Sequence, residues 1–123
     1  MKVSYEIVDI KNLLFVFDIE NTRDEEREKI IVSKNVNDDV ELSELFDALL
    51  KSEFLDYTPR EQVSLTDTIA HFLKEGDSFD RVFGRMTTYF DDDVLDQRRF
   101  MQVLLKCLVK YQLESSRSEI LND

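Results

Sequence analysis

Apolar and polar residues alternate through much of the first third of the chain, a pattern typical of half-buried β-strands. Residues 3–10 begin with this two-residue period, and Lys11-Asn12 suits a tight turn because Asn tolerates left-handed backbone. A second segment, residues 13–19, places four apolar side chains on one face: Leu13, Phe15, Phe17 and Ile19. Residues 29–33 form a third apolar run. The pattern predicts an antiparallel β-meander of two or three strands within residues 1–34.

From residue 37 the apolar spacing changes to that of amphipathic helices. We expect about four α-helices, with start signals at Asn37 or Asp38, at Thr58, at Asp77 or Ser78, and at Asp92 or Asp93. The segment Thr58-Pro59-Arg60-Glu61 has the strongest signal, because it combines an N-cap Thr, a Pro at the first helical position and a Glu that closes a capping box. Gly76 follows where a left-handed C-terminal cap belongs.

The last predicted helix, which continues to about Leu113, is apolar around most of its circumference. A helix of this kind is usually central, so we expect the other elements to pack around it. Residues 37–113 are thus expected to be mainly helical, residues 1–34 mainly strands, and residues 114–123 a frayed tail. The predicted fold class is α+β in one domain, since 123 residues fall within the common domain size of roughly 100–150.

Acidic residues outnumber basic ones by 27 to 16, which gives a formal net charge of −11. Residues 1–57 hold −8 of this charge, from 15 acids and 7 bases, and residues 58–123 hold −3, from 12 acids and 9 bases. The mixed run of residues 24–28 is expected to be a charged loop. Such a charge repels itself in the folded state, but it raises solubility and attracts basic partners over long range. The excess around the first predicted helix therefore favours a docking site for a basic molecule.

The sequence has no recognisable catalytic, cofactor-binding or metal-binding motif. We expect His71 on a solvated helix surface and Cys107 in the core, and neither has a positioned partner for nucleophilic catalysis. With only two glycines, the chain has no phosphate-binding glycine loop. The run Asp91-Asp92-Asp93 with Asp96 lacks the spacing of a calcium loop, and it favours helix capping, with partner contact as the alternative. We therefore expect no enzyme activity, no cofactor and no metal.

A short basic row lies on one face of the last predicted helix and consists of Arg99, Lys106 and Lys110. It is too small to be a nucleic-acid-binding surface in a chain of this charge. We expect these bases to neutralise acids on neighbouring elements or to form the solvated side of the helix.

The chain shows neither the basic and apolar regions of a secretory signal nor the roughly 20 consecutive apolar residues that span a bilayer. A cytoplasmic protein with no membrane contact is therefore expected.

Size, acidity and the lack of catalytic groups together favour a small inhibitor that captures a basic macromolecule. In these properties the chain resembles bacterial immunity proteins, which neutralise nuclease toxins of contact-dependent inhibition and bacteriocin systems. The resemblance implies that the partner is a nuclease domain, whose surface is basic because it must hold phosphates. Opposite fields would then speed association. The resemblance is one of class and not of motif, so it assigns no role to any residue.

The candidate partner-binding residues are seven acids and two tyrosines: Asp38, Asp39, Glu41, Glu44, Asp47, Tyr57, Tyr89, Asp91 and Asp93. The carboxylates would pair with Arg or Lys of the partner, and the tyrosines would act as anchors. Two other classes stay open. One is a phage-encoded anti-defence protein that mimics DNA, although interspersed Lys and Arg argue against it. The other is a scaffold or regulatory module that binds through apolar surface.

Overall fold

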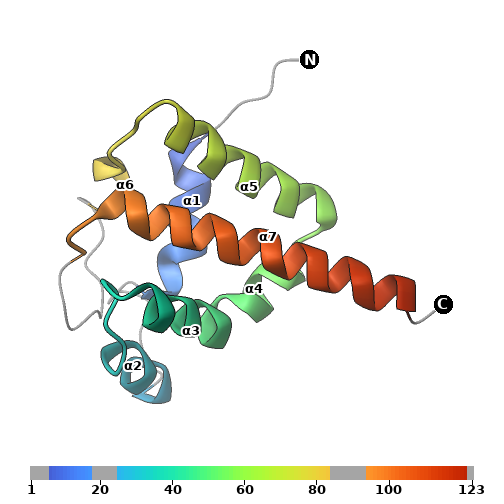
Figure 1. Cartoon of the computed structure of the whole chain (residues 1–123), viewed down its shortest axis with the longest axis horizontal. Helices are drawn as coiled ribbons and strands as arrows, with labels where there is room; N and C mark the ends of the chain where they lie inside the picture. The colour runs from blue at the N-terminus through green and yellow to red at the C-terminus, as the bar shows by residue number, and fades with distance from the viewer. Residues whose placement is uncertain (1–5, 18–24, 84–93, 122–123) are drawn as a thin grey trace.

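Helices occupy the part of the chain that was expected to form strands. The computed structural model describes residues 6–17, 25–83 and 94–121, and within them no strand occurs. Helix α1 spans Ile7–Leu14, a short 3-10 turn follows at Phe15–Phe17, and α2 spans Glu25–Val32 (Figure 1). The prediction of an α+β fold with an N-terminal β-meander is therefore wrong, because the described chain is helical throughout.

Helix α1 shows why the strand prediction failed. The fully buried residues of α1 and of the 3-10 turn that follows it recur at helical spacing: Ile10, Leu13, Leu14 and Phe17. Phe15 was expected on the same face as Leu13 and Phe17, yet it is 45% exposed. A short apolar segment can fit both periods, and contacts made elsewhere in the fold decide between them. Here α1 packs against α5 and α6, which bury the helical stripe, and the predicted turn at Lys11-Asn12 lies inside the helix.

Helix α2 replaces both the expected charged loop and the third strand. Three glutamates occupy its first turn, where a helix favours negative charge: Glu25, Glu26 and Glu28. Only the middle residue of the apolar run, Ile31, is fully buried, whereas Ile30 and Val32 lie on the exposed sides of the helix. Ile31 therefore joins this mostly polar helix to the hydrophobic core, and α2 lies against α3.

The remaining helices are α3 (Asp39–Leu49), α4 (Lys51–Asp56), α5 (Pro59–Lys74), α6 (Asp80–Phe83) and α7 (Gln97–Leu121). Three of the predicted caps are confirmed. The Asp38 side chain accepts the N–H groups of Val40 and Glu41, the capping box that joins Thr58 and Glu61 is complete, and Gly76 has a φ of +79°.

Three helix boundaries differ from the prediction. The last predicted helix continues to Leu121 and does not end at about Leu113, so residues 114–121 are helical and the prediction of a frayed tail is wrong for them. The first predicted helix is divided at Leu50 into α3 and α4. The last begins at Gln97 and not at Asp92 or Asp93, and its cap is Asp96, whose carboxylate accepts the N–H of Arg99 at 3.0 Å. Asp92 and Asp93 lie outside the described residues.

Helix α7 is central, as predicted. It contacts α5 on one side and α3 and α4 on the other, while α1 lies behind it (Figure 1). Phe100 of α7 meets Phe46 of α3 edge to face, with ring centroids 5.4 Å apart. None of the helices in the described part of the chain has the length and apolar character needed to cross a membrane.

Candidate functional site

Two acids of α3 are paired with α7. The carboxylate of Asp39 accepts two hydrogen bonds from the guanidinium of Arg99, from Nε and Nη2, each at 2.9 Å. Two turns further along, Asp47 accepts a hydrogen bond from the hydroxyl of Tyr111 and lies 3.6 Å from the ammonium of Lys110. We call the surface formed by Asp39, Asp47, Arg99 and Lys110 the paired face. It confirms the expectation that bases of the last helix neutralise acids on a neighbouring element.

The pKa values on the paired face follow from this geometry. The hydrogen bonds from Arg99, together with its charge and that of Lys106, hold the pKa of Asp39 below its ordinary value. Burial and then the bond to Asp47 raise the pKa of Tyr111 far above that of a free tyrosine. Asp39 stays ionised and Tyr111 stays protonated, so both contacts persist over the physiological pH range.

The other three candidate acids of this region also have partners within the chain. Asp38 caps α3, Glu41 accepts the backbone N–H of Asn35 at 3.2 Å, and Glu44 lies 3.3 Å from the ammonium of Lys34. All five acids around α3 that were predicted to meet a basic partner are thus engaged by groups of the protein itself. Three of them, Asp39, Glu44 and Asp47, are paired with a base, so their charge is partly neutralised before any partner arrives.

A groove of about 550 Å³ lies between α3 and α7 beside these pairs. Arg99, Lys106 and Lys110 line one side of it, and Asp39 and Asp96 contribute the opposite charge. Cys107 lies at its base and is buried, as predicted. Burial raises the pKa of the Cys107 thiol, which keeps it in the unreactive thiol form.

Tyr57, a predicted anchor, lies between α4 and α5 in a different part of the molecule. Its carbonyl accepts a hydrogen bond from the buried side chain of Gln62 at 3.0 Å, and the same amide bonds to the carbonyl of Phe54. The Tyr57 ring meets the Phe54 ring edge to face, with centroids 6.2 Å apart. These contacts fix both the backbone and the ring of Tyr57, which remains half-buried.

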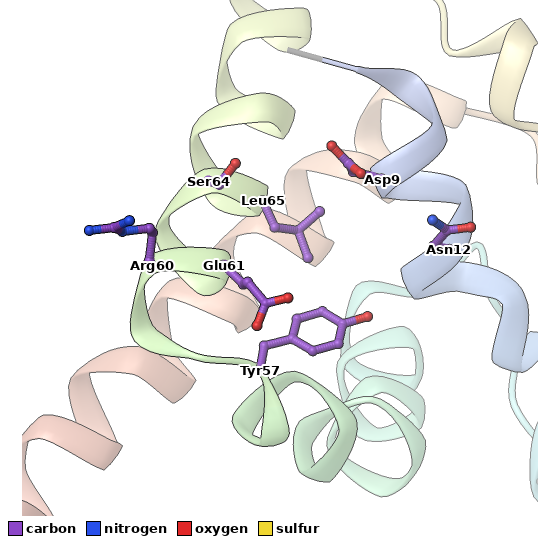
Figure 2. A pocket seen from close by; sticks show the side chains of 7 residues that line it. All are labelled: Asp9, Asn12, Tyr57, Arg60, Glu61, Ser64 and Leu65. Carbon is purple, nitrogen blue, oxygen red and sulfur yellow. The ribbon is translucent and has the colours of Figure 1, made fainter. Parts of the chain in front are cut away.

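The ring of Tyr57 forms one wall of a pocket of about 430 Å³ between α1 and α5. Figure 2 shows the seven residues that line this Tyr57 pocket: Asp9, Asn12, Tyr57, Arg60, Glu61, Ser64 and Leu65. In that view Asp9, Glu61 and Leu65 surround the space above the Tyr57 ring. The guanidinium of Arg60 points away from this space. The pocket therefore presents an aromatic ring and two carboxylates.

Three carboxylates from three helices act on Tyr57. Its pKa is raised, first by burial and then by the negative charges of Glu53, Glu61 and Asp9. Glu61 is committed in part, since its Oε1 accepts the N–H of Thr58 in the capping box. Among the described residues, neither Asp9 nor Glu53 forms an ion pair or a side-chain hydrogen bond. Negative charge is thus concentrated here, and the one base that lines the pocket, Arg60, forms no ion pair with these carboxylates among the described residues.

Asp9 and Glu53 were not among the predicted site residues. Asp9 stood in a predicted strand, and only the helical register of α1 turns it towards α5. The signal that could have found it is the helical spacing of Ile10, Leu13 and Phe17 in the same segment. Glu61 was interpreted as a capping residue, and it also lines the pocket.

The remaining predicted site residues, Tyr89, Asp91 and Asp93, lie outside the described part of the chain. In the part that is described, no group of three or more His, Cys, Asp or Glu side chains is arranged to hold a metal ion.

Comparisons with protein-family models, with curated proteins and with solved structures found no match for this chain. The site is therefore interpreted from its own geometry.

Proposed function

We propose that this chain is a small, non-enzymatic, cytoplasmic binding protein that neutralises a basic macromolecule, as an immunity protein does a nuclease toxin. It would act by covering the basic surface of the partner with its own acidic one. The proposal places the main contact at the Tyr57 pocket, where negative charge is unpaired, and gives the acids of α3 a secondary role.

One observation carries this proposal: Asp9, Glu53 and Glu61 surround a half-buried tyrosine without forming an ion pair to any described residue. Negative charges that act on one position attract an incoming cation there. A rigid tyrosine beside them suits an interface, because its amphipathic ring buries much surface at little cost in conformational entropy. The net charge of −11 adds long-range attraction for the same partner.

A DNA mimic, the second class considered, is less well supported along α3. A mimic needs a row of unpaired negative charges spaced like phosphates, and here Lys34, Arg99 and Lys110 lie against three of the acids in that row. The alternation of acids and bases leaves little resemblance to a phosphate backbone.

The test is co-expression of the chain with a panel of cationic bacterial nuclease-toxin domains, scored by rescue of growth and by inhibition of nuclease activity. For a domain that is inhibited, we expect the association rate constant to fall about tenfold or more as salt is raised from about 0.05 M to about 0.5 M. If no domain is inhibited, or if the association rate is insensitive to salt, the proposal is wrong.

Two double variants with the same change in net charge locate the contact. Asp9→Asn with Glu53→Gln removes two charges at the Tyr57 pocket, and Glu41→Gln with Glu44→Gln removes two on α3. The first pair should slow association more than the second, because Glu44 is already paired with Lys34 and Glu41 accepts the N–H of Asn35. Equal slowing by both pairs would mean that only the overall charge matters.

A further inference from the structure

We infer that the Tyr57 pocket receives an arginine side chain of the basic partner, with the guanidinium stacked on the Tyr57 ring and paired with Asp9 and Glu61. This inference rests on the proposed function, and it adds the chemical group that the partner must present. The pocket is then the place where one anchor residue of the partner inserts.

The shape and lining of the pocket fit a long cationic side chain. Its volume of about 430 Å³ exceeds that of a single side chain, and Leu65 provides an apolar surface for the methylene groups of an arginine stem. Asp9 and Glu61 come from opposite walls, α1 and α5 (Figure 2). A planar group entering between these walls meets a carboxylate on each side and the tyrosine ring on its face.

The lining favours a guanidinium over an ammonium. A guanidinium carries five donors in a rigid fork, stacks on aromatic rings and is more weakly hydrated than the ammonium of lysine. The pocket offers acceptors of three kinds: the carboxylates of Asp9 and Glu61, the amide oxygen of Asn12 and the hydroxyl of Ser64. Of Glu61, Oε1 is used by Thr58, whereas Oε2 accepts no hydrogen bond from a described residue.

The protein contains an internal example of the pairing proposed. On the paired face Asp39 holds the guanidinium of Arg99 through two bonds of 2.9 Å at a partly exposed site. Such a two-pronged bond is a geometry that lysine cannot reproduce. At the Tyr57 pocket the carboxylates have no such guanidinium, since Arg60 points away from the space that they enclose (Figure 2).

The experiment is a titration of the isotopically labelled protein with blocked dipeptides, followed by NMR. We use N-acetyl-Arg-Arg-amide and compare it with N-acetyl-Lys-Lys-amide. The arginine peptide should shift the amide signals of Asn12, Tyr57 and Ser64, and its dissociation constant should be at least about threefold lower than that of the lysine peptide. Signals of α3 and α7 around Asp39 and Lys110 should move little.

Variants of the pocket sharpen the test. Tyr57→Leu should weaken binding of the arginine peptide about tenfold through loss of the stacked ring, whereas Tyr57→Phe, which keeps a ring, should preserve most of it. Asp9→Asn should weaken binding more than Glu44→Gln, which makes the same change in net charge on α3. Arg60→Gln should strengthen binding, because it removes a positive charge at the rim.

Equal affinity for the two peptides, shifts confined to α3 and α7, or no binding would each overturn the inference. The inference and the proposed function can fail separately. A nuclease domain that binds with a steep salt dependence, but is indifferent to Tyr57→Leu, supports the function and removes the arginine contact. If the arginine peptide binds in the pocket but no nuclease domain is inhibited, the arginine contact is supported and the proposed function is wrong.

Discussion

The paired face and the Tyr57 pocket are both acidic in sequence, yet they have opposite electrostatic character. Asp39 and Asp47 of the paired face are held by Arg99 and Lys110 of α7. The carboxylates around Tyr57 come from α1, α4 and α5 and have only Arg60 nearby, which points elsewhere (Figure 2). The acids of the paired face are therefore held by bases of the protein itself, whereas the acids around Tyr57 remain available to a partner.

A count of acids along the chain is therefore a poor measure of unpaired charge. A surface ion pair contributes little stability. Each charge in the pair is nevertheless less available to an opposite charge on another molecule. Assigning a docking site from charge thus requires knowing which helices lie side by side.

Truncation of one apolar side chain beneath each region should give the largest difference between them. Phe46 lies under the paired face, fully buried against Phe17 and Phe100, and Phe46→Ala should lower the free energy of unfolding by about 3–5 kcal/mol. Leu65 forms part of the Tyr57 pocket, so the space left by Leu65→Ala would open to solvent, and the loss should be about 2 kcal/mol. Denaturant unfolding measures both, and a larger loss for Leu65→Ala would contradict the comparison.

Removal of Asp47 should show that an acid of the paired face is structural. Asp47→Ala leaves the buried Tyr111 without the acceptor of its hydroxyl, which should lower the free energy of unfolding by about 1–3 kcal/mol. Asp9→Asn, at an exposed position of the pocket, should leave stability unchanged or raise it slightly. A double-mutant cycle with Tyr111→Phe isolates the pair, and a coupling near zero would mean that the bond contributes nothing.

The parts of the fold that could be predicted are those specified by neighbouring residues. Helix α5 carries its own cap at Thr58, its Pro59 and its ending at Gly76, so its bounds were found from the sequence. Helix α1 carries no such signal, and its apolar residues fit a strand or a helix until α5 and α6 bury one stripe. The local sequence is sufficient to predict an element only where capping and turn residues add to the evidence of the hydrophobic period.

The ion pairs of the paired face could be anticipated only in outline. The basic row of the last helix was expected to meet acids, but Asp39 and Arg99 are 60 residues apart. Which acid meets which base depends on how α3 packs along α7, and no local signal encodes that. The same holds for the pocket. Asp9 and Glu61 line it from α1 and α5, and the alternating pattern did not reveal that the segment around Asp9 is a helix.

Acid should weaken the paired face and the capping box of α5 over similar ranges of pH. The pKa values of Asp39 and Glu61 are both lowered in the folded state, by the bonds from Arg99 and from Thr58 respectively. A lowered pKa means stability that is fully present above the ordinary values of 3.8 and 4.5 and is lost as pH falls through the folded ones. The melting temperature should therefore decline between about pH 5 and about pH 2.

Asp39→Asn and Glu61→Gln should each flatten part of this decline, and they differ at neutral pH. Gln can still accept the N–H of Thr58, so Glu61→Gln should keep the helix cap, whereas Asp39→Asn loses the charge that holds Arg99. At neutral pH the melting temperature of Asp39→Asn should therefore be the lower of the two. An unchanged acid profile in both variants would show that neither group is responsible for the pH dependence.

The smallest predicted effect is the most direct measure of the pocket's field. The pKa of Tyr57 is raised by burial and by Glu53, Glu61 and Asp9, so Asp9→Asn should lower it toward the ordinary tyrosine value while burial keeps it above. Tyrosinate absorbance, corrected with Tyr57→Phe, follows this one group. Asp39→Asn, which makes the same charge change on the paired face, should leave the Tyr57 titration where it is. If the Tyr57 pKa shifted equally in both variants, the field at Tyr57 would reflect the charge of the whole protein. The pocket would then not be a local concentration of unpaired charge.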